Sequence, residues 1–122
     1  MSESISVLIV DDEEDFVEML SLRLEATGFD VRGVNSAPDG LAALAEQEAD
    51  VVVLDLKMPG MDGLETLEKI KAAHPAVAVI IMTGHGAMES ATRGKELGAF
   101  DYLIKPAEFE ELVEKLEAAA KA

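Results

Sequence analysis

The chain has 122 residues, with 25 acidic against 10 basic side chains and a formal net charge of −15. This balance argues against direct binding to nucleic acid or to an anionic membrane surface, which both require a basic footprint. The 49% hydrophobic content indicates one globular domain over residues 1–122, and the absence of cysteine excludes disulfides and thiolate chemistry.

The sequence alternates short β-branched runs with longer helix-periodic runs. In chain order, these predict a strand at 5–10, a helix at 13–27, a strand at 29–34, a helix to 46, a strand at 51–54, a helix to 73, a strand at 77–82, a helix at 87–97, a strand at 100–104 and a helix at 108–120. No apolar run is long enough to span a membrane, and we expect a soluble cytoplasmic protein.

Several residues predict where the helices begin, end and face. Gly28 is a good terminator for the first helix, and Ser36 or Asn35 can cap the second. We expect Leu41, Ala42 and Leu44 of that second helix to face inward. The fourth helix has few apolar anchors and an internal Gly94, which predicts low local stability.

Five strand–helix repeats predict an α/β fold with a parallel sheet and helices on both faces, because the connections are too long for hairpins. The first, third and fourth strands are almost continuously apolar, as central strands are. The expected architecture is therefore a flavodoxin-like (βα)5 three-layer sandwich with the strand order 2-1-3-4-5.

Acidic side chains follow two strands that this order makes neighbours. Asp11 and Asp12 follow the first strand, and Asp55 follows the third. In open parallel sheets the site lies beyond the carboxyl ends of the strands, where the winding reverses. Like charges gathered there need a raised pKa or a bound cation, and their hard oxygen atoms favour Mg²⁺.

The next two strand ends add a hydroxyl and an ammonium. Thr83 ends the fourth strand, and Lys105 follows the fifth. Together with the carboxylates and a divalent cation, these groups form a place for a phosphoryl group, where transfer depends mainly on positioning and electrostatic stabilisation. Asp55 would be the nucleophile and would become an acyl phosphate.

Each residue also has a structural interpretation. Asp12 could cap the first helix, whose dipole Glu13, Glu14 and Asp15 would complement. Asp55 could be a turn former, and Asp62 is more simply a helix cap. His74 is expected to be an exposed loop residue, and His85 a loop or rim residue. The joint placement of the other residues on one sheet edge favours the functional interpretation.

Over essentially its whole length, the chain resembles the receiver domain of two-component response regulators. The motifs that carry the resemblance are VLIVDDEEDF, VVVLDLKMPGMDGLE, VIIMTGHG and GAFDYLIKP. The resemblance implies that Asp55 accepts a phosphoryl group from a histidine kinase or a phosphotransfer protein. It also implies that Asp12, Asp55 and the backbone carbonyl of Lys57 ligate Mg²⁺, with Asp11 acting through water.

The resemblance further implies a switch. Thr83 and Tyr102 match the hydroxyl and the aromatic residue whose movements repack the face made by the fourth helix, fifth strand and fifth helix. That face would signal to an output protein or output domain, with a phosphorylation-dependent dimer as one outcome. The Lys105–Pro106 bond is expected to be cis. Lys57 and His85 depart from the common pattern and are expected to affect phosphoryl lifetime.

Two other functions are disfavoured by the motifs. Haloacid-dehalogenase-like phosphohydrolases place a general acid two residues after the nucleophile, where this chain has Lys57. A flavodoxin-like flavin binder needs a Ser-, Thr- and Gly-rich phosphate loop, where this chain has DDEED, and a GxxxxGK nucleotide motif is absent. The TGHG and AFDYLIKP motifs resemble those of receivers attached to enhancer-binding transcription activators. We therefore expect a switch, not an enzyme beyond self-directed phosphotransfer and slow autodephosphorylation.

Overall fold

The computed structural model describes residues 4–58, 61–84 and 88–122. Strands and helices alternate as the sequence predicts, with one short pair of strands added. The strands are β1 (Ser6–Val10), β2 (Asp30–Val34), β3 (Val51–Leu54), β4 (Lys57–Met58), β5 (Met61–Asp62), β6 (Ala78–Thr83) and β7 (Asp101–Ile104). The helices are α1 (Glu14–Thr27), α2 (Ala37–Glu46), α3 (Gly63–Ala73), α4 (Met88–Glu96) and α5 (Phe109–Lys121).

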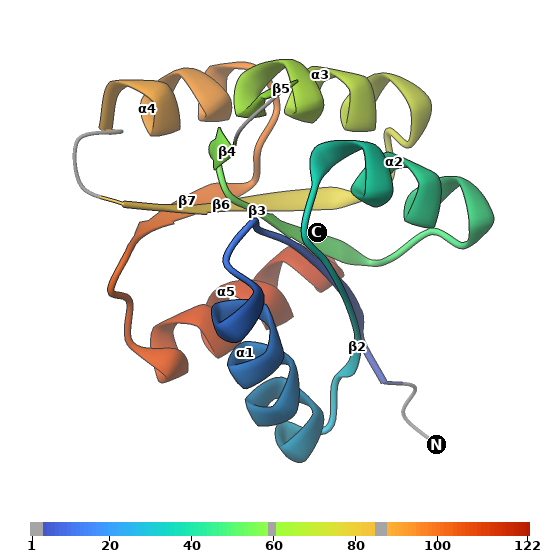
Figure 1. Ribbon diagram of the computed structural model, residues 1–122, viewed down its shortest axis with the longest axis vertical. Helices are drawn as coiled ribbons and strands as arrows, with labels where there is room; N and C mark the ends of the chain where they lie inside the picture. The colour runs from blue at the N-terminus through green and yellow to red at the C-terminus, as the bar shows by residue number, and fades with distance from the viewer. Residues whose placement is uncertain (1–3, 59–60, 85–87) are drawn as a thin grey trace.

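The main sheet has five parallel strands in the order β2-β1-β3-β6-β7. Since β6 and β7 are its fourth and fifth strands along the chain, the predicted order 2-1-3-4-5 is confirmed. The three apolar strands are central, and the more mixed β2 and β7 lie at the edges. Helices α1 and α5 cover one face of the sheet, and α2, α3 and α4 cover the other (Figure 1).

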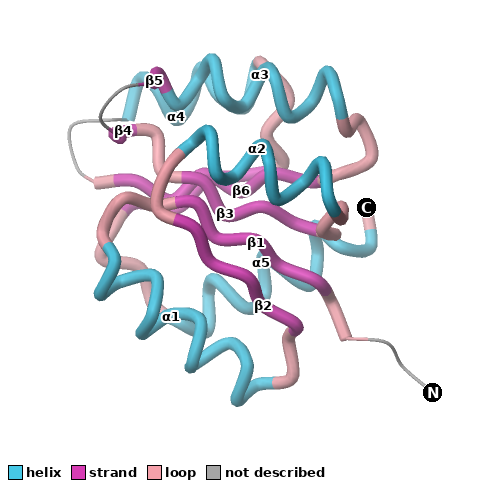
Figure 2. Tube along the Cα trace, turned by 45° about the vertical axis from the view of Figure 1, so that its right-hand side comes forward, coloured by secondary structure: helices cyan, strands magenta, loops and turns pink. Residues whose placement is uncertain are grey.

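The sheet separates two apolar clusters because side chains alternate between its faces. On β1, Leu8 and Val10 belong to the cluster on the α2–α3–α4 side, whereas Val7 and Ile9 belong to the cluster on the α1–α5 side. The tube view shows the strands lying between the two helical layers (Figure 2). The phosphoacceptor predicted at position 55 thus follows a strand, β3, that is buried from both sides.

The short antiparallel pair β4–β5 was not predicted. It joins Lys57 to Asp62 and Met58 to Met61 immediately after β3. Gly63 begins α3 directly afterwards, and a Cβ atom there would lie 2.3 Å from Leu56 Cα. Only glycine therefore allows the start of α3 to approach the backbone that follows the phosphoacceptor so closely.

Three predicted helix ends are confirmed. Gly28 follows α1 in the left-handed region with φ 108°. The Ser36 side chain accepts a hydrogen bond from the Asp39 N–H and caps α2, and the Asp62 side chain caps α3 by accepting from the Leu64 N–H. These caps define where α1 ends and where α2 and α3 begin.

Two expectations for single residues are wrong, those for Ala42 and His74. Ala42 is exposed, because the buried stripe of α2 runs through Ala37, Gly40 and Leu44. The alternative interpretation of Asp12 as the cap of α1 also fails, because the N-cap position is Glu13 and no side chain caps this helix. His74 is not an exposed loop residue: it ends α3 half-buried, with its Nδ1 2.6 Å from Glu48 Oε2.

Helix α4 packs against β6 at Gly94. A Cβ atom on Gly94 would lie 2.2 Å from Ile81 Cδ1, so glycine at this position permits the approach of α4 to β6. The expected start of this helix at residue 87 lies outside the described residues. Among the residues that the structure describes, no helix has the length and apolar character needed to cross a membrane.

Candidate functional site

The polar residues predicted from the strand ends do meet at one edge of the sheet. Asp11 follows β1, Asp55 follows β3, Thr83 is the last residue of β6, and Lys105 follows β7. Because these strands are parallel, their carboxyl ends lie on the same side. Asp11, Asp55 and Thr83 are buried despite being polar. Such buried polar groups require partners, and each has them.

Asp55 is held by two hydrogen-bond donors on one oxygen. The Thr83 hydroxyl donates to Asp55 Oδ1 over 2.9 Å, and the Lys57 backbone N–H donates to the same oxygen over 3.0 Å. The other oxygen, Oδ2, lies 3.6 Å from Lys105 Nζ. The carboxylate is therefore fixed in orientation, with one oxygen bound to donors and the other facing a cation.

Lys105 lies at the centre of the charged groups. Its Nζ donates to Asp11 Oδ2 over 2.6 Å and to Glu13 Oε1 over 3.1 Å, and it lies 4.4 Å from the centroid of the Phe16 ring. An ammonium group over an aromatic face is attracted by the ring. One cation thus neutralises part of an acidic cluster and links β7 to the start of α1.

The electrostatics of the site follow from burial and these pairs. Burial raises the pKa of Asp11, and the nearby Asp55 carboxylate adds to this effect, which outweighs the hydrogen bonds from Lys105 and the Glu13 N–H. Burial alone would lower the pKa of Lys105, but the hydrogen bonds to Asp11 and Glu13 raise it overall. The ion pairs therefore favour the protonated form of Lys105, whereas burial disfavours the ionised form of Asp11.

Three carboxylates fit a hard cation. One oxygen from each of Asp11, Asp12 and Asp55 lies within 4.8 Å of the others, and two of the three residues are buried. Oxygen donors of this kind, close together and short of positive charge, suit Mg²⁺. The structure therefore brings together the side-chain ligands that the sequence predicts.

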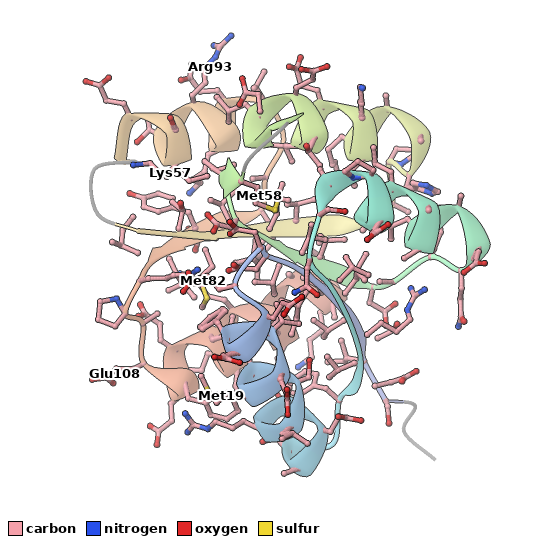
Figure 3. The ribbon with its side chains drawn as sticks, in the orientation of Figure 1. Met19, Lys57, Met58, Met82, Arg93 and Glu108 are labelled. Atoms are coloured by element: carbon pink, nitrogen blue, oxygen red, sulfur yellow. The ribbon has the colours of Figure 1, made fainter. Side chains whose placement is uncertain are left out.

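The other predicted residues are more scattered. Lys57 has an exposed side chain on β4 (Figure 3), and only its backbone N–H is bonded to Asp55. Tyr102 is half-buried on β7 and packs against the cluster on the α2–α3–α4 side. The Lys105–Pro106 peptide bond is cis, as expected. The prediction for His85 lies outside the described residues.

Three residues at the site were not predicted from the sequence. Glu13 and Phe16 contact Lys105, and the Asn35 side chain donates to the Asp11 carbonyl over 3.1 Å. Glu13 was expected to complement the dipole of the first helix, and the position of Phe16 agrees equally with an apolar stripe on α1. Their contacts with a residue about ninety positions away leave no local pattern in the sequence, so no signal was available to find them.

The geometry suits a phosphoryl group at Asp55. A buried carboxylate lies between a hydroxyl donor and an ammonium group, beside a carboxylate cluster able to hold a divalent cation. Groups arranged in this way offset the charge of a phosphoryl group without needing a separate catalytic base.

Comparisons with known proteins show the family to which the chain belongs. The profile of the response regulator receiver domain matches residues 7–117. The transcriptional regulatory protein ZraR of Escherichia coli is 40% identical over 117 residues, which cover 96% of this chain and 26% of ZraR. The DNA-binding transcriptional regulator NtrC of Salmonella typhimurium is 41% identical, over 93% of this chain and 24% of its own length. The chain thus spans about a quarter of the length of these relatives.

Solved structures give the same result. A response regulator receiver domain protein from Clostridium thermocellum superposes with a TM-score of 0.92 at 35% identity, covering 96% of this chain and 94% of that one. The receiver domain of NtrX from Brucella abortus has a TM-score of 0.90 at 33% identity, covering 95% and 98%. The family profile, the relatives and the solved structures agree, and the chain belongs to the family of response regulator receiver domains.

Proposed function

We propose that this receiver domain is a phosphoacceptor switch in which Asp55 takes a phosphoryl group from a histidine kinase or a phosphotransfer protein. The observation that carries the proposal is the buried Asp55 carboxylate, fixed by Thr83 and facing Lys105. Function follows from such a site and not from the fold alone.

The transfer itself requires little from the protein beyond positioning. An oxygen of Asp55 forms a bond to phosphorus while the bond from phosphorus to the donor's nitrogen or oxygen breaks, and the leaving group takes that electron pair and a proton. Thr83 would then donate to a phosphoryl oxygen, and Lys105 would offset its charge. Attack by water later releases inorganic phosphate and restores the carboxylate.

We assign the cofactor as Mg²⁺, which would be held by Asp12, Asp55 and the Lys57 carbonyl, with Asp11 acting through water. When bound, this ion would neutralise charge on the phosphoryl oxygens. The residues themselves supply the oxygen cluster and keep it rigid, since Asp11 is fixed through Lys105 and the N–H of Glu13.

The phosphodonor is proposed to contact the groove beside Lys105. A cavity of about 500 Å³ lies between α1 and the start of α5, with a mainly apolar lining. Met19, Met82 and Glu108, which are labelled in Figure 3, lie around it. A protein that presents a phosphorylated residue to Asp55 reaches this groove at the same time, because Lys105 lines both the groove and the site.

The output is proposed to leave through α4, β7 and α5. Thr83 ends β6, which pairs with β7 so that Ile81 lies beside Tyr102. On the same strand, Asp101 forms one ion pair with Lys95 of α4 and another with Lys115 of α5. A shift at Thr83 would therefore reach Tyr102 and both helices, and an output domain or a phosphorylation-dependent dimer would recognise the new face.

The remaining features of the proposal follow from this role. Residues 1–122 act as one receiver domain, without catalysis beyond transfer to Asp55 and slow loss of the phosphoryl group. The proposed compartment is the cytoplasm, where a histidine kinase would supply the phosphoryl group. Neither nucleic acid nor a membrane is a direct partner, consistent with the net charge of −15.

The test is phosphorylation by a small donor. The chain is incubated with acetyl phosphate and Mg²⁺ and analysed by intact-protein mass spectrometry. We expect a mass gain of one phosphoryl group that disappears in Asp55→Asn and on chelation of Mg²⁺. Asp15→Asn, which alters an exposed acid on α1, is the matched control and should keep the gain. A wild-type chain that gains no mass would overturn the proposal.

A further inference from the structure

The contact between Glu13 and Lys105 has no part in the proposed transfer. Lys105 has three N–H donors, and Asp11 and Glu13 accept two of them. Asp55 Oδ2 lies at 3.6 Å, beyond hydrogen-bond distance. The ammonium group is therefore hydrogen-bonded on the α1 side of the site and lies just beyond hydrogen-bond distance of the residue it has to serve.

The two carboxylates that hold Lys105 differ in how easily they can release it. Asp11 is buried, and its other oxygen accepts the N–H of Glu13 over 3.0 Å, so its position is fixed. The Glu13 side chain is 64% exposed and has water as an alternative partner. Ion pairs with an exposed partner contribute little, so a phosphoryl group could displace Glu13 but not Asp11.

We propose that Glu13 is a positioning residue that acts as a latch on Lys105, slowing phosphorylation until a phosphoryl group displaces its carboxylate. This inference rests on the proposed function, since it concerns the same site. Phe16 supports the exchange, because its ring lies 4.4 Å from Nζ and keeps contact with the ammonium group while Glu13 leaves.

The test separates a latch from simple repulsion of an anionic donor. Glu13→Gln removes the charge, whereas Glu13→Asp keeps it on a side chain one carbon shorter that no longer reaches Lys105. Glu14→Gln makes the same charge change on a neighbour that forms no ion pair within the described part of the chain. Rates are measured with acetyl phosphate and with phosphoramidate, and thermal melts confirm that each variant is folded.

A latch predicts that Glu13→Gln and Glu13→Asp are both phosphorylated about two- to fivefold faster than wild type, the factor expected for an exposed ion pair. The factor should be similar for both donors, and Glu14→Gln should match wild type. If Glu13→Asp behaves as wild type, or if Glu14→Gln accelerates as much as Glu13→Gln, the latch is wrong while the phosphoacceptor function stands. A wild-type chain that takes no phosphoryl group would instead overturn the function itself.

Discussion

Replacing Lys105 with Met should destabilise the protein in a way that Mg²⁺ reverses. Met keeps most of the volume and the contact with Phe16 but removes the cation of the acidic cluster. The Lys105 side chain is 17% exposed and that of Asp11 only 3%, so the lost pair is largely buried. Removing one partner of a fully buried pair costs about 3–5 kcal/mol, and the remaining exposure reduces this to about 2–3 kcal/mol. For a chain of this size, the melting temperature should fall by about 8–12 °C.

Two further readouts identify the cause of that loss. Bound Mg²⁺ stabilises the folded state by mass action, and its gain in melting temperature should be larger in Lys105→Met, where a neighbouring positive charge is gone. The folded-state pKa of Asp11, already raised, would rise further in the variant, so its carboxylate destabilises the fold as pH rises through that pKa. The gap to wild type should therefore widen from acidic to neutral pH.

Calorimetry in chelator and in Mg²⁺ provides the measurement, with Lys115→Met as the matched control. Lys115 also pairs with an aspartate, Asp101, but both side chains are about one-quarter exposed. Its loss should cost only about 0.5–1 kcal/mol and leave the Mg²⁺ response unchanged. The reasoning is refuted if Lys105→Met melts within about 2 °C of wild type in chelator, or if Mg²⁺ stabilises both proteins equally.

Two other substitutions test the fold around the site. Asp101→Asn should cost about 1 kcal/mol at neutral pH. Burial acts to raise the pKa of Asp101, but hydrogen bonds from Lys115 and the Tyr102 N–H lower it overall. The stabilisation by the Asp101 carboxylate should therefore disappear as pH falls below 3.8. A difference in urea-unfolding free energy between wild type and Asp101→Asn that stays the same at every pH would contradict this. Gly63→Ala should cost about 2–3 kcal/mol, because the added Cβ would lie 2.3 Å from Leu56 Cα. Gly84→Ala should be nearly neutral, because no atom of the described residues lies within 4 Å of an added Cβ. Equal urea midpoints for the two glycine variants would show that the close approach at Gly63 is unimportant.

The sequence was sufficient for the strand order and for the placement of the charged residues. Alternation of β-branched and helix-periodic runs specifies the βα repeat, and a parallel sheet then brings Asp11, Asp55, Thr83 and Lys105 to one edge. The two-residue strands β4 and β5 escaped prediction because such short segments have no periodicity. The buried face of α2 was partly misplaced because Gly40, which has no hydrophobic side chain, packs where a Cβ would lie 2.9 Å from Val10 Cγ2.

The sequence predicted which residues form the site better than it predicted the contacts of their side chains. A position at a strand end specifies where a residue lies but not which neighbours its side chain contacts. Those contacts depend on loops that differ in length and direction. Glu13 illustrates the limit, because its position at the start of α1 agrees with a helix-dipole role and equally with the observed contact to Lys105.

The partition of the interior by the sheet also has a consequence for how this domain can vary. Leu20 on α1 and Leu67 on α3 belong to different apolar clusters. Substitutions in separate packing units combine almost independently. The packing of each helical layer can therefore accumulate changes without requiring matched changes in the packing of the other layer.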